Sequence, residues 1–294
     1  MKKPNLKPTG LDPEVLLTRA YDVILPSPNG RKPPPILSPE GALRVGVDLG
    51  TAYTVLVVLD ELGTPLAGEY RFTQVVRDGL VVDYIGAVDI LREIKRNVEA
   101  RLGCKLTHAA SGFPPGVPPA EHQSTANVVE AVGMMCKDLI SEPTAANNVL
   151  GIRDGVIVDI GGGTTGIAVV EDGQVIYTAD EATGGIHMSL VIAGGADISF
   201  EAAEAQKIDP EQQPRLFPLV RPVMEKMGTI IAKHLRGFRV DSIVLVGGTS
   251  LFPGIAAVIQ EITGLPTQVA THPMFVTPVG IAIHDKTGLK EHNQ

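Results

Sequence analysis

The chain has 294 residues, 44% of them hydrophobic, and a formal net charge of -8 at pH 7. This apolar content excludes a largely disordered protein, and the length predicts two domains of ordinary size. The acidic balance argues against nucleic acid as a partner, and two cysteines are too few for a disulfide framework, so we expect a cytoplasmic protein. No apolar leader follows the N-terminus, and we expect no contact with a membrane.

Residues 1–43 differ in composition from the rest of the chain. They are rich in proline, including the run Pro33–Pro35, and these prolines interrupt any long periodic element. We expect an N-terminal extension or tether, partly in polyproline conformation, and a tail without function is the alternative. Leu11–Leu25 leaves room for one short helix.

A unit of strand, glycine loop and strand occurs twice, about 110 residues apart. In each copy an apolar strand ends in an aspartate, Asp48 or Asp159, and the next strand follows a tight loop. The segments are Arg44–Gly50, Val55–Leu59, Val156–Gly163, Ile167–Val170 and Gln174–Ile176. A repeat of this kind predicts a fold built from two related halves.

The remaining elements alternate between helices and strands. Apolar residues at spacings of three and four predict the helices, and short apolar runs predict the strands. Helices are predicted at Ala87–Leu102, Ala120–Gly133, Pro143–Leu150, Ile198–Ile208, Val220–Leu235 and Pro253–Thr263. Strands are predicted at Thr107–Gly112, Lys137–Ile140 and Ser242–Val246, and the last folded piece is Met274–His284.

Three loops share one design, in which a buried strand leads into a turn of glycine and hydroxyl residues. They are Gly50-Thr51-Ala52-Tyr53, Gly161-Gly162-Gly163-Thr164-Thr165 and Gly247-Gly248-Thr249-Ser250. Glycine lets backbone N–H groups converge on an anion. If Asp48 and Asp159 are buried they need a partner, and a hydrated Mg²⁺ would supply it. Each loop alone is typical of an ordinary turn, but the matched pair predicts two hairpins that clamp a magnesium triphosphate.

Glu142 is a third candidate carboxylate, because it directly precedes Pro143 at a predicted helix start. The alternative for Glu142 is a favourable interaction with the helix N-terminus and no catalytic role.

The three loops, in this order and spacing, resemble the phosphate-1, phosphate-2 and adenosine motifs of the actin, sugar-kinase and heat-shock-chaperone ATPase superfamily. Ile140–Ala146 and Val279–Ala282 are similar to its two connecting segments. The resemblance implies an α/β, ribonuclease H-like fold with two lobes and a nucleotide cleft between them. The first lobe would be 44–153 and the second 154–284. Residues 274–284 would return to the first lobe, and 285–294 would form a tail.

Several short sequence segments are similar to one branch of this superfamily, the chaperone-like proteins encoded with ethanolamine-utilisation microcompartments. They are Val76–Gly79, Leu102–Cys104, Phe113–Gly116, Ala179–Gly185 and Pro222–Met227. The resemblance implies a cytoplasmic, microcompartment-associated protein that helps assemble or reactivate its clients, which would be microcompartment enzymes or shell proteins.

The resemblance also implies ATP or ADP with Mg²⁺ as cofactors. Asp48 and Asp159 would hold the metal through water, and Glu142 would orient the attacking water or the metal. The phosphates would meet Gly50, Thr51, Ala52, Tyr53, Gly161, Gly162, Gly163 and Thr164. The ribose and purine would meet Gly184, Gly185, Glu204, Lys207, Gly247, Gly248 and Thr249.

Two positions depart from the chaperone pattern. Gly166 stands where those chaperones often carry an aspartate, and Leu251 takes the place of an arginine that stacks on adenine. No equivalent of the catalytic lysine can be placed. We therefore expect ATP binding with weak Mg-dependent hydrolysis. The alternatives are a nucleotide-binding scaffold without turnover, a small-molecule kinase and a filament-forming protein.

Overall fold

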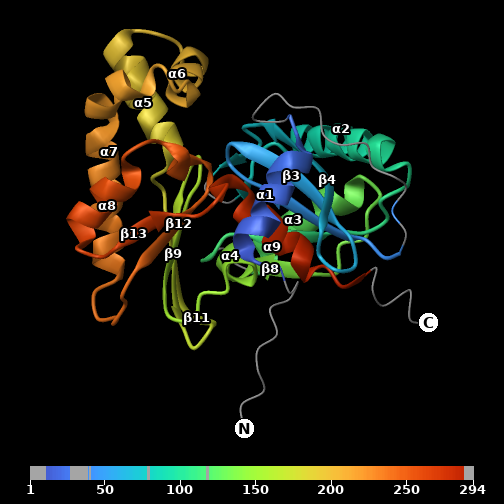
Figure 1. Ribbon diagram of the computed structural model, residues 1–294. Coiled ribbons are helices and arrows are strands. Elements are labelled where there is room, and N and C mark those ends of the chain that lie inside the picture. The colour runs from blue at the N-terminus through green and yellow to red at the C-terminus, as the bar shows by residue number, and fades with distance from the viewer. Residues whose placement is uncertain (1–10, 27–38, 40, 78–79, 117–118, 288–294) are drawn as a thin grey trace. The chain divides into compact units, whose positions relative to one another are not determined.

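The computed structural model describes residues 11–26, 39, 41–77, 80–116 and 119–287, and the chain divides into two compact units (Figure 1). Unit 1 comprises residues 1–151 and 275–294, and unit 2 comprises residues 152–274. Among the helices of the described ranges, none combines the length and the apolar character needed to cross a membrane.

Unit 1 contains a six-stranded sheet of order β1-β4-β3-β2-β7-β8. Its strands are β1 (Ile24–Leu25), β2 (Arg44–Leu49), β3 (Tyr53–Leu59), β4 (Pro65–Phe72), β7 (Ala110–Phe113) and β8 (Leu139–Ser141). A short hairpin of β5 (Val76–Arg77) and β6 (Leu80–Val81) lies outside this sheet. β2, β3 and β4 are antiparallel neighbours, whereas β7 and β8 continue from β2 in parallel.

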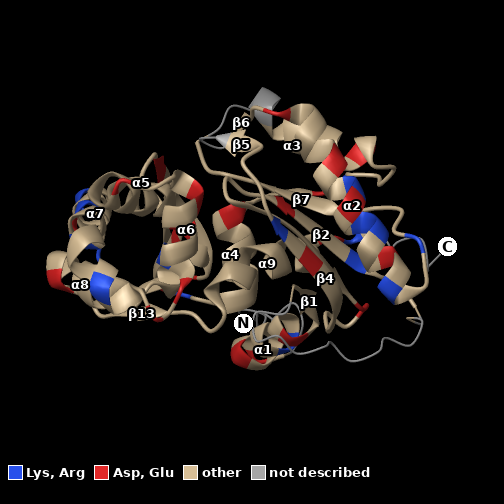
Figure 2. Ribbon diagram, turned by 90° about the horizontal axis from the view of Figure 1, so that it is seen from above, with Lys and Arg blue, Asp and Glu red and all other residues tan. Residues whose placement is uncertain are grey.

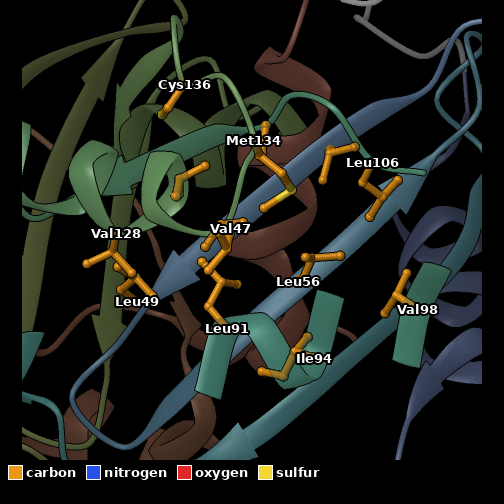
Figure 3. Close-up of a cluster of buried hydrophobic side chains, with 14 of the residues drawn as sticks. Val47, Leu49, Leu56, Leu91, Ile94, Val98, Leu106, Val128, Met134 and Cys136 are labelled. Atoms are coloured by element: carbon orange, nitrogen blue, oxygen red, sulfur yellow. The ribbon is translucent and has the colours of Figure 1, made fainter. Parts of the chain in front are cut away.

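The described helices of unit 1 cover this sheet. They are α1 (Pro13–Val23), α2 (Tyr84–Leu102), α3 (Pro119–Ala131), α4 (Glu142–Leu150) and α9 (Val276–His284). The apolar stripe of α2, including Leu91 and Ile94, packs on Val47 and Leu56 of the sheet (Figure 3). The opposite side of α2 carries both acidic and basic residues (Figure 2). This amphipathic pattern is the one that the spacing in the sequence predicts.

Unit 2 contains a five-stranded sheet of order β11-β10-β9-β12-β13. Its strands are β9 (Gly155–Ile160), β10 (Thr165–Glu171), β11 (Gln174–Glu181), β12 (Ile243–Val246) and β13 (Thr267–Val269). Its described helices are α5 (Gly185–Ala196), α6 (Phe200–Ile208), α7 (Gln213–His234) and α8 (Ile255–Thr263), with the 3₁₀ turns η1 (Gly248–Leu251) and η2 (Pro273–Phe275). Apolar residues of α5, α7 and α8 pack with those of β9, β10 and β12 into one core.

The two sheets have the same plan. The order β4-β3-β2-β7-β8 in unit 1 corresponds to β11-β10-β9-β12-β13 in unit 2. In both, an antiparallel meander of three strands is followed by two parallel neighbours. The prediction of two related α/β halves is confirmed.

The N-terminal segment differs from the expected extension. α1 begins at Pro13 after the cap Asp12, and β1 pairs in parallel with β4, Ile24 lying opposite Gly68. Leu16 and Leu17 are each 1% exposed, so they belong to the core. Residues 13–25 are therefore part of unit 1, because they bury apolar side chains and add a strand to its sheet. The proline run at 33–35 lies outside the described residues.

Arg101 of α2 holds this N-terminal segment. Its guanidinium donates to the carbonyl oxygens of Val23 and Gly68, both at 2.8 Å. We expect Arg101→Ala to lower the free energy of unfolding by about 2 kcal/mol and to speed amide exchange in α1, because two carbonyls lose their donor. Hydrogen exchange tests this, with the exposed Arg96→Ala on the same helix as control. Unchanged protection of α1 in Arg101→Ala would contradict the prediction.

Several predicted elements have different bounds or were missed. The helix α5 was not predicted, and the helix predicted from Ile198 begins at Phe200, after the cap Ser199. The helix predicted from Pro253 begins at Ile255, because Pro253 and Gly254 form a turn in which Gly254 has a left-handed backbone conformation. The strand predicted at Thr107–Gly112 is confined to Ala110–Phe113. The last predicted piece forms η2 and α9, and α9 packs on β2 and α4 of unit 1.

Candidate functional site

The two predicted hairpin loops have the same hydrogen bond. In unit 1 the Gly50 amide donates to the Tyr53 carbonyl at 2.9 Å, and in unit 2 the Gly161 amide donates to the Thr164 carbonyl at 3.0 Å. Both bonds join a residue to the one three positions later. The repeat in sequence is therefore also a repeat in loop geometry.

Each loop follows an aspartate at the carboxyl end of a strand. Asp48 is the penultimate residue of β2 and Asp159 that of β9, and both are partly buried. Asp48 lies opposite Val55 of β3, and Asp159 opposite Gly166 of β10. Equivalent carboxylates thus stand beside equivalent loops.

In unit 1 the site residues gather at the carboxyl ends of the parallel strands. β2, which bears Asp48, lies beside β7, and β7 lies beside β8, after which Glu142 begins α4. A Cβ added to Gly112 of β7 would lie 3.4 Å from Cγ of Glu142. The ring of Tyr53 packs edge-on against the rings of Tyr70 and Phe72, so this side chain is occupied in packing.

In unit 2 the carbonyls of the glycine loop are tied to the protein. The Gly161 carbonyl accepts from the Gly185 amide at 3.0 Å and from the Thr249 hydroxyl at 2.8 Å. The Gly162 carbonyl accepts from the Ile186 amide at 2.8 Å. The first residues of α5 and η1 therefore hold this loop in position.

The amides of the same loop differ from its carbonyls in their hydrogen bonding. Within the described part of the chain, the N–H groups of Gly162, Gly163 and Thr164 donate to no protein acceptor. Consecutive amides without a protein acceptor in a tight turn can form an anion-binding concavity, and glycine at 162 and 163 places no side chain beside these amides. The loop can therefore bind a phosphate group through its backbone.

Three glycines allow the elements around this loop to approach closely. A Cβ on Gly184 would lie 2.6 Å from the Gly162 carbonyl oxygen, and a Cβ on Gly185 would overlap the Thr249 hydroxyl. Gly247 has φ +86°, and a Cβ there would overlap the Asp159 carboxylate. These close approaches explain why glycine occupies all three positions.

Glu204 and Lys207 form an ion pair on α6. Lys207 Nζ lies 2.6 Å from Glu204 Oε2 and also donates to the Gly185 carbonyl at 3.2 Å. Burial lowers the pKa of Lys207, and the negative charge of Glu204 opposes that shift. In unit 2 the ion pair therefore lies beside Gly185, which itself bonds to the glycine loop at 161–164.

Two contacts in the site were not predicted from the sequence. Thr249, predicted beside a purine, uses its hydroxyl to hold the Gly161 carbonyl, and Ser189 of α5 contacts Glu204. A lone serine in an apolar segment carries no signal of such a contact. Among the described residues, no group of three His, Cys, Asp or Glu side chains is arranged to hold a metal directly.

The sequence and the structure of this chain are both similar to those of known proteins. The chain is 43% identical over 241 residues to ethanolamine utilization protein EutJ of Salmonella typhimurium, covering 82% of this chain and 85% of that protein. The crystal structure of EutJ from Carboxydothermus hydrogenoformans is similar, with a TM-score of 0.86 and 42% identity over 93% of this chain and 98% of the other.

More distant matches concern the fold. MreB 5 of Spiroplasma citri bound to AMPPNP has a TM-score of 0.68 at 17% identity, over 87% of this chain and 99% of that one. A family model described as type IV pilus assembly protein PilM matches residues 130–280. These likenesses confirm the predicted actin-like ATPase fold. With its high identity to the Salmonella protein, the chain belongs to the EutJ family, within the superfamily of actin-like and Hsp70-like ATPases.

Proposed function

We propose that this chain binds ATP with Mg²⁺ and acts as a chaperone-like protein with weak ATPase activity. The loop at 161–164 carries the proposal, because the carbonyls of Gly161 and Gly162 accept protein hydrogen bonds while the three amides of 162–164 have no acceptor among the described residues. Phosphate is a suitable anion for such a loop. The neighbouring Glu204–Lys207 pair offers polar contacts for the rest of a nucleotide.

The residues present suit a hydrated magnesium ion. Mg²⁺ prefers oxygen ligands and keeps several waters, so carboxylates can hold it without a cluster of three direct ligands. Asp159, beside the loop of unit 2, would hold its water shell, and Asp48 is the equivalent carboxylate of unit 1. When bound, the ion neutralises phosphate charge, and Glu142 would orient a water molecule.

Weak turnover agrees with two features of the chain. Position 166 is a glycine, so β10 adds no carboxylate beside Asp159. Leu251 is 58% exposed, and it supplies no charged group that could stack on a purine. We therefore expect the protein to bind ATP but to hydrolyse it slowly. Similarity to the ethanolamine utilization proteins of Salmonella and Carboxydothermus supports a role in ethanolamine utilisation. The clients in this proposal are microcompartment enzymes or shell proteins.

Calorimetric titration with ATP, with and without Mg²⁺, tests the binding. We expect Mg²⁺ to strengthen binding and Asp159→Ala to weaken it at least about tenfold, because one carboxylate of the metal shell is lost. Asp241→Ala removes an exposed carboxylate of the same unit and serves as control. Equal affinity in the wild type and Asp159→Ala, or no binding by the wild type, would contradict the proposal.

The partner requires a separate experiment. The chain would be used as bait in extracts of cells grown on ethanolamine, with and without ATP. We expect an ATP-dependent complex with a microcompartment enzyme or shell protein. Recovery of neither class would contradict the client assignment while leaving the nucleotide site intact.

A further inference from the structure

Ser189 is a buried polar residue that the proposed site has not yet used. It lies on α5, it is fully buried, and its hydroxyl oxygen is 2.5 Å from Glu204 Oε2 and 3.2 Å from the Gly185 carbonyl. A serine has one hydroxyl proton, and the shorter contact is a charge-assisted bond to a carboxylate. Ser189 therefore donates to Glu204.

Lys207 contacts the same carboxylate oxygen. Its Nζ lies 2.6 Å from Glu204 Oε2, and the side chains of Glu204 and Lys207 are only 13% and 11% exposed. Two donors thus meet at Oε2, and among the described residues no donor bonds to Oε1. Because Ser189 and Lys207 both donate to Oε2, they restrict rotation of the carboxylate. The other oxygen, Oε1, is then available to accept a hydrogen bond from a ligand.

This acceptor lies in the same cluster as the phosphate loop. Gly185, whose carbonyl accepts from Lys207, donates its own amide to the Gly161 carbonyl of the loop. A Cβ on Gly185 would lie 3.2 Å from Lys207 Nζ. A ligand with its phosphates on the loop would therefore present its neighbouring part to Glu204. A carboxylate oxygen can only accept, so the group that it recognises must be a hydrogen-bond donor, and in a nucleotide the part next to the phosphates is a sugar, whose donors are hydroxyl groups.

We propose that Ser189 is a positioning residue, which orients Glu204 so that the site selects a sugar with free hydroxyls over one that lacks them. The inference rests on the proposed binding of ATP. A mostly buried acceptor left without a donor is costly, so a deoxy ligand is disfavoured. Without the Ser189 hydroxyl, Glu204 can rotate, and the difference between the two ligands disappears.

Affinities for ATP and for 2′-deoxy-ATP and 3′-deoxy-ATP, all with Mg²⁺, test this role. We expect the wild type to prefer ATP over at least one deoxy analogue by about tenfold. In Ser189→Ala that ratio should fall to about twofold or less, through weaker ATP binding alone. Ser189→Thr keeps the hydroxyl and should keep the preference. Thr263→Ala removes a different helical hydroxyl, which donates to the Ile259 carbonyl, and should also keep it.

The outcomes separate this inference from the proposed function. No ATP binding by the wild type overturns both. ATP binding with equal weakening of all ligands in Ser189→Ala, or with an unchanged ratio, overturns the positioning role alone. Glu204→Gln gives a second test if Ser189→Ala does not fold, because loss of the charged acceptor should reduce the same ratio. An unchanged ratio in Glu204→Gln likewise overturns the inference.

Discussion

Replacing Gly280 by alanine is expected to lower the free energy of unfolding of unit 1 by at least about 3 kcal/mol. Gly280 lies in the middle of α9, and a Cβ there would overlap the backbone carbonyl of Ala145 in α4. The atoms that this Cβ would meet all belong to the backbone of Ala145, which cannot rotate away as a side chain could, so one of the helices must move.

Movement of α9 is costly because both of its neighbours are close. On its other side, a Cβ on Gly46 of β2 would lie 2.8 Å from Cα of Ala282. Residues 276–283 of α9 are all buried. The helix is therefore confined between a strand and a helix at backbone distance, and no flexible side chain is available to absorb an added methyl group.

Chemical denaturation of the purified variant measures this effect. Gly194→Ala is the matched control, because Gly194 also lies inside a helix but its added Cβ would have no atom within 4 Å. Alanine has the higher helix propensity, so the control should be neutral or stabilised by up to about 1 kcal/mol. A Gly280→Ala variant as stable as the wild type would show that α9 is not confined in this way.

Gly184→Ala is expected to weaken ATP binding at least about 100-fold with a smaller effect on stability. The added Cβ would lie 2.6 Å from the Gly162 carbonyl oxygen and 2.8 Å from that of Gly161. Relief requires the start of α5 to separate from the loop, which breaks the bonds from the Gly185 and Ile186 amides. The open amides of the loop then lose their common orientation, and their contacts with a phosphate weaken together.

Titration with Mg-ATP, beside thermal unfolding, separates binding from folding in this variant. Gly195→Ala on the same helix is the control, because its Cβ would meet only the side chain of Leu219, at 3.4 Å. We expect the control to bind ATP as the wild type does. ATP affinity in Gly184→Ala within about threefold of the wild type would contradict the proposed role of this glycine.

The parts of the fold that the sequence predicted well are local. The strand around Asp48 and the strand around Asp159 are continuous apolar segments, and each is followed by glycine. Strand formation and a tight turn depend on neighbouring residues, so the same local pattern produces the same hairpin twice. Glu204 and Lys207, which the resemblance implied as ribose and purine contacts, form an ion pair that we did not predict, although residues three apart lie next to each other on a helix.

The parts that the sequence did not predict depend on distant partners. α5 contains Gly194 and Gly195, which disfavour a helix, and its first amides bond to carbonyls of the loop at 161–162. The N-terminal strand exists only because Ile24 finds a place opposite Gly68. These contacts join residues that are far apart along the chain, so no local pattern indicates them.

The amino-acid sequence by itself determined the duplicated hairpins, the position of their aspartates and the family, because these depend on short segments that fold in the same way wherever they occur. Only the tertiary structure decided how the loop of unit 2 is used. It bonds the loop carbonyls to α5 and η1, leaves the amides of 162–164 without an acceptor among the described residues, and places Ser189 against Glu204. A polar group acts according to its bonding partners, and here those partners come from separate elements that meet only when the chain folds.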